Sequence, residues 1–491
     1  MKTDLQDLKR KSVRGGIVTM ASQAISIAIQ LASTVILARL LSPDDYGIIA
    51  MVMAITAFAG IFRDLGLSSA AVQKKDLTRA QQSNLFWLNV AMGTVLTAIV
   101  AAASPLVAWF YGQPELTLVT IALSFTFVIG SLGTQHGARL VREMQFGRRA
   151  VAAISGSIAG LITSVTLALQ DFAYWALVWG LLSAGITTTV LLFILSPFRP
   201  ALFSRNAGIR EMLGFGANVT LFELVNYFHR NLDNVLIGKF WGTDALGLYS
   251  RAYQLLMFPI TAIRGPINAV AFPAMSRLLN QPDAYRVYYR RVTHLLAFVS
   301  MPLTAFLFVA SSPIIELLLG REWLGVAPLF SLLALTAFIQ PVAGLRGMVL
   351  LSSGQSGRYA QWGILNAVCV SIAFIVGVQW GSIGVAIAYA VVNYTILYPS
   401  LLFVFKKTPL RSSDFFIPIS GPAIASIVAV FMSWAIVRAD WIDQLCLVLK
   451  IVSLGGSFVV AYFICTVLLP SGWSDLKRCA ALLHRGQFSR I

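Results

Sequence analysis

The stretch Ala38-Arg39-Leu40-Leu41-Ser42-Pro43-Asp44-Asp45-Tyr46-Gly47 returns 200 positions later as Gly238-Lys239-Phe240-Trp241-Gly242-Thr243-Asp244-Ala245-Leu246-Gly247. In both copies a cation precedes two bulky apolar residues, and an Asp lies three residues before a closing Gly. The surrounding chain is 57% hydrophobic and only 12% charged, whereas soluble domains carry about 25% charged residues. A duplicated half in so apolar a chain is typical of transporters built from two related bundles.

Apolar runs recur along all 491 residues, and each is near the ~20 residues that cross a bilayer. We predict an all-α integral membrane protein with about fourteen transmembrane helices, forming two related six-helix bundles and two extra C-terminal helices. The expected domains are 1–205, its repeat 206–408, and 409–491 with the two extra helices and a cytoplasmic tail. The predicted spans are 15–40, 46–67, 84–108, 116–138, 150–170, 173–195, 210–238, 245–272, 292–315, 326–349, 359–378, 382–405, 415–437 and 445–469.

The positive charges alternate between the connections. Of the 37 Lys and Arg residues, 28 lie at the N-terminus, at the C-terminus and in every second connection, and four lie in the other connections. Cytoplasmic loops of membrane proteins hold the excess of Lys and Arg. We therefore expect a multi-pass protein with both termini in the cytoplasm. The opposite loops are short, so no external domain is expected to carry an enzyme site.

The sequence contains no motif for a cofactor or metal. The four cysteines form no C-x-x-C pair and none is near a His, so we interpret them as small apolar residues. No G-x-x-x-x-G-K-[ST] loop is present. We expect no cofactor, and transport driven by an ion gradient or by downhill flux of the cargo.

The seventh span carries a polar stripe. Glu223, Asn226, Arg230 and Asp233 follow the spacing i, i+3, i+7, i+10, which places them on one helical face, with Tyr227 beside them. Two interpretations stay open. The stripe is either an internally paired network around Arg230 or the wall of a hydrated cavity.

Other ionisable residues also fall at membrane depth, where charges are costly and usually face a partner or a cavity. Arg63 and Asp64 end the second span and are expected to pair with each other or with a later span, while Arg251 and Arg264 lie on the eighth. Arg346 fits either a cavity mouth or ordinary positive-inside charge. Because arginine binds phosphate and carboxylate well, this excess favours an anionic cargo. The acids available for ion coupling are Glu223, Asp233 and Asp64.

Several stretches resemble the polysaccharide transporter (Wzx-type flippase) family of the multidrug/oligosaccharidyl-lipid/polysaccharide exporter superfamily, most closely its colanic-acid and succinoglycan type exporters. They are Ala38–Gly47, Asp64–Lys75, Asp233–Lys239, Ala245–Ala252 and Leu319–Trp323. The resemblance implies two six-helix bundles around a cationic cavity. It also implies translocation of undecaprenyl-pyrophosphate-linked oligosaccharide repeat units across the bacterial inner membrane, for exopolysaccharide, capsule or lipopolysaccharide biosynthesis.

We therefore expect a flippase for a lipid-linked anionic oligosaccharide, working with membrane lipid and with a polysaccharide polymerase and export machinery, and binding no nucleic acid. The expected cargo-binding residues are Arg230, Arg251, Arg264, Arg63, Arg346, Asn226 and Tyr227. The alternatives are an ion-coupled small-molecule antiporter of the same superfamily and a membrane polysaccharide polymerase. At the offset of 200, the charged stripe of the seventh span falls on neutral polar residues of the first span. Anion binding is therefore expected mainly in the second half.

Overall fold

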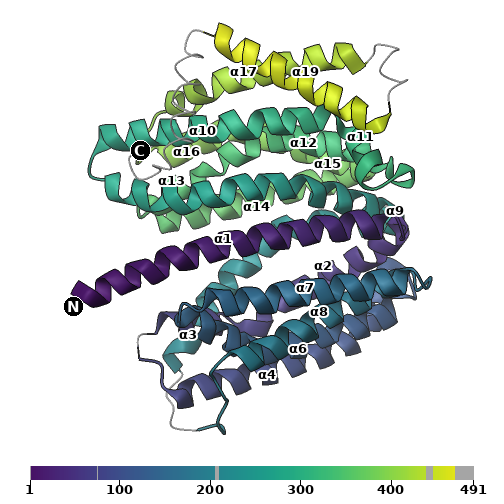
Figure 1. Cartoon of the computed structure of the whole chain (residues 1–491), viewed down its shortest axis with the longest axis vertical. Coiled ribbons are helices and arrows are strands. Elements are labelled where there is room, and N and C mark those ends of the chain that lie inside the picture. Colours follow the sequence, from purple (N-terminus) through teal and green to yellow (C-terminus); the bar gives the residue numbers. More distant parts are fainter. Residues whose placement is uncertain (1, 75, 205–209, 438–445, 470–491) are drawn as a thin grey trace. The chain divides into compact units, whose positions relative to one another are not determined.

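The computed structural model describes an all-helical chain (Figure 1). It describes the backbone of residues 2–74, 76–204, 210–437 and 446–469, except that no side chains are described for 2–14, 17, 70, 73, 210–226, 228–230 and 436–437. These residues divide by packing into two compact units, Met1–Gly247 and Leu248–Ile491. The predicted domain boundaries at 205 and 408 follow the sequence repeat instead, and they stay a prediction.

The first unit contains eight helices and the start of a ninth. Their bounds are α1 Lys2–Ala38, α2 Pro43–Asp64, α3 Leu67–Gln73, α4 Arg79–Ala102, α5 Ser104–Tyr111, α6 Leu116–Arg142, α7 Phe146–Ala168, α8 Tyr174–Leu195 and α9 Arg210–Leu278. Capping residues determine where α2 begins and ends. Ser42 and Asp45 form a capping box at the start of α2, and Leu65 and Gly66 end that helix in the left-handed conformation, which stops an α-helix from continuing.

The second unit holds the remainder of α9 and the C-terminal helices. These are α10 Pro282–Val309, α11 Ser311–Leu318, η1 Arg321–Trp323, α12 Val326–Ala343, α13 Leu345–Ser352, α14 Ser356–Gly377, η2 Val378–Trp380, α15 Gly381–Thr395, α16 Leu397–Phe405, α17 Ser412–Val437 and α19 Leu447–Leu468. α10 packs against both α12 and α17, and α17 runs beside α19 (Figure 1). Tyr285, Tyr289 and Met301 of α10 are buried in the core of this unit.

The described helices confirm the fourteen predicted crossings. Twelve helical stretches are long and apolar enough to span a membrane, and two of them, Asn231–Leu278 and Ser356–Phe405, are 48 and 50 residues long. At about 1.5 Å per residue each is more than twice the ~30 Å of a bilayer core. Gly381 (φ 77°) divides the second stretch into two crossings, and Gly242 (φ 82°) divides α9 in the same way, since the described backbone of that helix begins at Arg210 and is 69 residues long.

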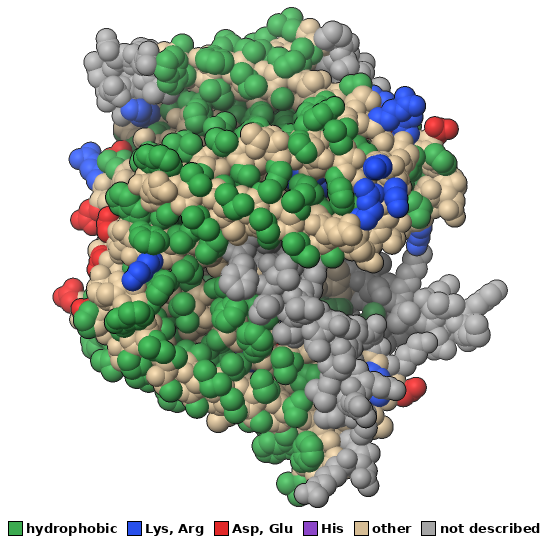
Figure 2. Space-filling model, turned by 180° about the vertical axis from the view of Figure 1, so that it is seen from behind, with side chains coloured by type: hydrophobic (Ala, Val, Ile, Leu, Met, Phe, Trp, Pro, Cys, Tyr) green, Lys and Arg blue, Asp and Glu red, His purple; other side chains and the backbone are tan. Residues whose placement is uncertain are grey.

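The surface agrees with a lipid environment. On the face drawn in Figure 2, hydrophobic side chains spread across the molecule, and charged ones gather toward its edges. Large apolar side chains such as Ile162, Ile194 and Val460 are more than half exposed. Such an apolar surface on consecutive helices is expected where lipid tails take the place of water.

The two copies of the repeated motif lie against each other inside the first unit. A Cβ placed on Gly47 would be 1.9 Å from the carbonyl oxygen of Thr243, and one placed on Gly247 would be 1.9 Å from the carbonyl oxygen of Pro43. Thr243 is the counterpart of Pro43 at the offset of 200, so the contact is reciprocal. The Thr243 hydroxyl also donates a hydrogen bond to the carboxylate of Asp44. Reciprocal contacts are what two copies related by a two-fold axis make.

Candidate functional site

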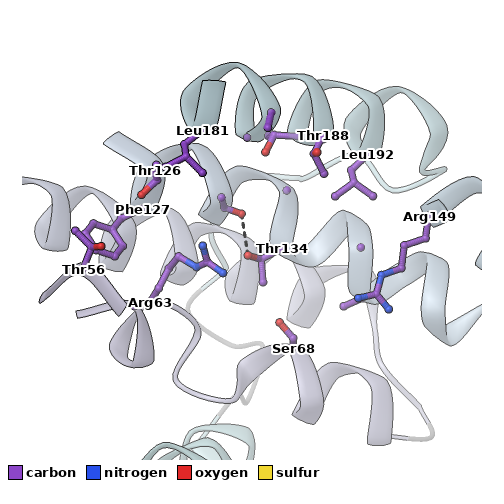
Figure 3. Close-up of a pocket in the computed structure, with 18 of the residues that line it drawn as sticks. Thr56, Arg63, Ser68, Thr126, Phe127, Thr134, Arg149, Leu181, Thr188 and Leu192 are labelled. Atoms are coloured by element: carbon purple, nitrogen blue, oxygen red, sulfur yellow. Dashed lines mark hydrogen bonds between the residues drawn. The ribbon is translucent and has the colours of Figure 1, made fainter. Parts of the chain in front are cut away.

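A cavity of about 1270 Å³ lies within the first unit (Figure 3). Its walls come from α2, α3, α6, α7 and α8. α7 and α8 pack closely behind it because their contact is made by small residues. A Cβ on Gly160 would lie 2.8 Å from the carbonyl oxygen of Gly180, and a Cβ on Gly180 would lie 1.8 Å from Ser164 Oγ. Small residues at such spacing allow close approach of membrane helices.

The lining of this cavity is cationic and rich in hydroxyl groups. Among the described residues that form it, the charged ones are Arg63 and Arg149, and no acid occurs. Eight lining residues carry a hydroxyl group: Thr56, Ser68, Ser69, Thr126, Thr134, Ser157, Thr188 and Thr189. The cavity is therefore suited to a polar ligand with negative charge.

Arg63 occupies the middle of the cavity. Its side chain points from α2 toward Thr134 of α6, while Arg149 lies at the end remote from Thr56 and Phe127 (Figure 3). A Cβ on Gly130 of α6 would lie 2.6 Å from Arg63 Nη1, so the missing side chain is what admits the guanidinium. Arg63 Nε is buried and has no hydrogen-bond partner in the described part of the chain.

The neighbouring acid does not neutralise Arg63. The Asp64 carboxylate accepts hydrogen bonds from the Ser68 amide at 3.2 Å and the Ser68 hydroxyl at 2.7 Å. It also accepts one from Asn89 Nδ2 at 2.9 Å. Of the two expectations for Asp64, the pairing with Arg63 is thus not formed among the described residues. Asp64 instead holds the turn into α3, and no acid occurs in the described lining around Arg63.

The second unit contains a similar arrangement. A Cβ on Gly344, between α12 and α13, would lie 2.7 Å from Arg264 Nη2. Arg264 lies on the eighth predicted span and Gly344 on the tenth, whereas Arg63 lies on the second and Gly130 on the fourth. Each half of the repeat therefore packs a guanidinium from its second span against a glycine of its fourth.

Arg346 is held by the protein itself. It is 9% exposed, its Nε donates to the carbonyl oxygen of Ala343 at 2.7 Å, and its Nη1 donates to the Ser400 hydroxyl. Its guanidinium also lies over the ring of Trp362, 5.2 Å from the centroid. These contacts are all internal to the protein, and the two interpretations from the sequence, a cavity mouth and ordinary positive-inside charge, stay predictions.

The polar stripe of the seventh span is described only in part. The side chains of Glu223, Asn226 and Arg230 lie outside the described residues. Asp233 is 5% exposed, and its carboxylate accepts a hydrogen bond from the Asn234 amide at 2.9 Å. The Tyr227 hydroxyl donates to the carbonyl oxygen of Ala54 on α2.

Tyr227 also packs its ring 5.2 Å from that of Phe58 on α2. The described part of the stripe thus contacts the helix that carries Arg63. Arg251 is half-buried on α9 and does not line the described cavity.

Sequence reasoning missed several features of the cavity. Arg149 had been counted only among the loop cations. The glycine face of α6, made of Gly130, Gly133 and Gly137 at i, i+3 and i+7, marks one helical face and would have indicated a wall where side chains are absent. Among the described residues no group of three His, Cys, Asp or Glu is placed to hold a metal ion.

The chain is similar to known proteins over most of its length. Residues 36–328 match the family described as polysaccharide biosynthesis protein. The chain is 29% identical to the teichuronic acid biosynthesis protein TuaB of Bacillus subtilis (strain 168), covering 75% of this chain and 77% of that one. It is 24% identical to the lipopolysaccharide biosynthesis protein WzxC of Escherichia coli (strain K12), covering 87% and 88%.

Its fold is shared with a solved transporter. The inward closed conformation of the lipid II flippase MurJ superposes with a TM-score of 0.75 at 14% identity, covering 92% of this chain and 98% of that one. At that identity the likeness shows the fold alone. Taken with the match to residues 36–328, it completes the assignment: the chain is a multi-pass membrane member of the polysaccharide biosynthesis protein family, with the fold of MurJ.

Proposed function

We propose that this protein is a flippase that moves undecaprenyl-pyrophosphate-linked oligosaccharide repeat units across the bacterial inner membrane for the assembly of a surface polysaccharide. The observation that carries the proposal is the cationic cavity, whose described lining contains no acidic side chain, in a member of a polysaccharide biosynthesis family. TuaB and WzxC carry names from polysaccharide biosynthesis, and MurJ is named a lipid II flippase. A drug antiporter for cationic cargo would need acids where this cavity has arginines.

In this proposal the membrane-depth arginines attract the anionic groups of the cargo, and rocking of the two bundles exposes them to each side in turn. Arginine suits the diphosphate because its planar donors bind phosphate oxygens in pairs. Acids on the seventh and second spans would couple an ion to the movement. The residues assigned to cargo are Arg63, Arg230, Arg251, Arg264, Arg346, Asn226 and Tyr227, and those assigned to coupling are Glu223, Asp233 and Asp64.

The fold neighbour MurJ is named a flippase, and we propose that this protein is likewise a transporter with no catalytic activity of its own. We further propose that both termini lie in the cytoplasm, because the cation-rich connections then all face that side. A polymerase and export machinery would take up the translocated units on the other side.

Deletion of the gene followed by lipid extraction tests this function. A flippase defect leaves undecaprenyl-linked repeat units on the inner leaflet, inaccessible to an impermeant sugar-modifying reagent in intact spheroplasts. Single repeat units exposed on the outer leaflet would instead identify a polymerase, and normal polymer in the deletion strain would remove the proposal altogether.

A further inference from the structure

We propose that the cavity of the first unit receives an acidic sugar of the transported oligosaccharide, and that Arg63 binds its carboxylate. The inference rests on the proposed function. It adds which part of the cargo binds in this cavity. The diphosphate is assigned to other arginines. Three properties of the cavity support the choice: the hydrogen-bonding state of its hydroxyl groups, the charge of Arg63, which no acid of the described lining meets, and the cavity volume.

Six of the eight hydroxyl groups of the lining have already used their protons. Thr134 Oγ1 donates to the carbonyl oxygen of Gly130 at 2.9 Å, Thr126 to that of Leu123 at 2.6 Å, and Thr189 to that of Ile129 at 3.0 Å. Thr56 and Ser157 likewise donate to carbonyl oxygens of their own helices, and Ser68 donates to the Asp64 carboxylate. A carbonyl or carboxylate oxygen only accepts, so in each case the hydroxyl is the donor.

A hydroxyl group has one proton and two lone pairs. Six of the eight hydroxyls therefore present acceptor lone pairs to the cavity. A ligand that fits must bring hydrogen-bond donors, because polar groups left unpaired out of water are costly. An ionised diphosphate brings only acceptors and would face these lone pairs unfavourably. A sugar brings a hydroxyl on nearly every carbon.

Arg63 adds a requirement for negative charge. Among the described residues its Nε has no hydrogen-bond partner, and Asp64 is held by Ser68 and Asn89, so a neutral sugar would bring no charge to meet the guanidinium. A carboxylate attached to the sugar ring supplies the two acceptor oxygens that a guanidinium binds in parallel. The ligand class that meets both requirements is a polyhydroxylated acid.

The cavity also has the size for more than one sugar. Its volume of about 1270 Å³ exceeds the ~300–1,000 Å³ of pockets that hold drug-sized ligands. Arg149 lines the end remote from Thr56 (Figure 3). It is exposed, so solvent screens its charge and we assign the selection of the acid to Arg63.

The test measures binding of soluble saccharides to the purified full-length protein by calorimetry. The probes are trigalacturonate, its neutral methyl ester and inorganic pyrophosphate. We expect the wild type to bind the acid at least about tenfold more tightly than the ester, since a charge-assisted pair is lost in the ester. Arg63→Gln should remove this preference and leave the affinity for the ester unchanged.

Two further variants separate the position of the Arg63 guanidinium from the general loss of a positive charge. Gly130→Ala retains the charge of Arg63 and displaces its guanidinium, since the new Cβ would lie 2.6 Å from Nη1, and it should also reduce the preference for the acid. Arg148→Gln is the matched control. It removes a cation next to Arg149 that donates to the carbonyl oxygen of Leu195 and does not line the cavity, so the preference should persist.

Equal affinity of the wild type for acid and ester would overturn the inference. So would a loss of pyrophosphate binding in Arg63→Gln with trigalacturonate binding unchanged. Translocation of a lipid-linked acidic oligosaccharide in reconstituted vesicles is measured separately. Translocation without an Arg63-dependent acid preference rejects this inference and keeps the proposed function. The preference without translocation rejects the function and leaves the cavity as a site for acidic sugars.

Discussion

The reciprocal contact of the repeated motif makes a quantitative prediction. In Gly47→Ala the new Cβ would lie 1.9 Å from the carbonyl oxygen of Thr243 and 2.4 Å from its carbon. Both atoms belong to the backbone, so no change of rotamer relieves the overlap. The two segments must instead separate by about 1 Å or more before the new Cβ reaches a van der Waals distance from the carbonyl group. Closely packed interiors contain no empty space that could take up the added atom.

The loss of folding free energy in Gly47→Ala has two parts. Overpacking of a close contact costs about 1–3 kcal/mol. Separation also stretches the hydrogen bond from the Thr243 hydroxyl to the Asp44 carboxylate, and a hydrogen bond to a charged group contributes about 1.5–3 kcal/mol. We expect Gly47→Ala to lower the free energy of unfolding by about 3 kcal/mol. Gly247→Ala, which meets the carbonyl oxygen of Pro43 at 1.9 Å, should cost a similar amount.

Unfolding of the purified protein in detergent, monitored by circular dichroism, measures these changes. Because the same separation relieves both overlaps, the double variant should cost clearly less than the two single costs added together. Gly363→Ala is the control: a Cβ there meets no atom within 4 Å, and replacing a helical glycine by alanine is neutral or slightly stabilising. Strict additivity, or a Gly47→Ala variant as stable as the control, would refute the reciprocal contact.

Two other predictions concern charged residues. Arg230→Gln should abolish polymer export while the protein still inserts in the membrane, and normal polymer output would remove Arg230 from the cargo site. Asp414→Asn should destabilise the protein by about 3 kcal/mol, because the buried carboxylate accepts from Arg286 at 3.1 and 3.3 Å and from the Arg411 amide at 2.8 Å. An unfolding midpoint equal to that of the wild type would show that these contacts contribute little.

The crossings could be predicted because the bilayer imposes a strong constraint. A span must satisfy its backbone hydrogen bonds internally and must reach about 30 Å, so apolar run length alone locates it. The predicted spans 210–238 and 245–272 lie on either side of Gly242, and 359–378 and 382–405 lie on either side of Gly381, and the alternation of charge supports this count. What run length does not reveal is the subdivision of spans, such as α12 and α13 meeting at Gly344.

The cavity was harder to predict because its helices are apolar on nearly every side. A helix such as α8 has no polar face that shows which side points inward. Arg63 was identified from its charge. The hydrogen bonds of Asp64, however, include one from Asn89, a polar residue on α4 that the sequence analysis did not identify as a partner. Lone polar residues in an apolar run are thus where a sequence search for buried partners should begin.

The paired guanidinium and glycine of the two halves are more than a remnant of duplication. Arg63 and Arg264 are separated by 201 positions, and Gly130 and Gly344 by 214, so neither pair keeps the offset of 200 that aligns the motifs. At that offset Arg264 falls on Asp64, and a step of one residue turns a side chain about 100° around a helix. The two halves thus make the same close approach of a guanidinium to a glycine although the spacing along the chain differs between them. In the first unit, where the cavity is described, the absence of a side chain at Gly130 leaves room for the Arg63 guanidinium beside the lining of α6, and under the proposed function that is the position from which it would meet an anionic group.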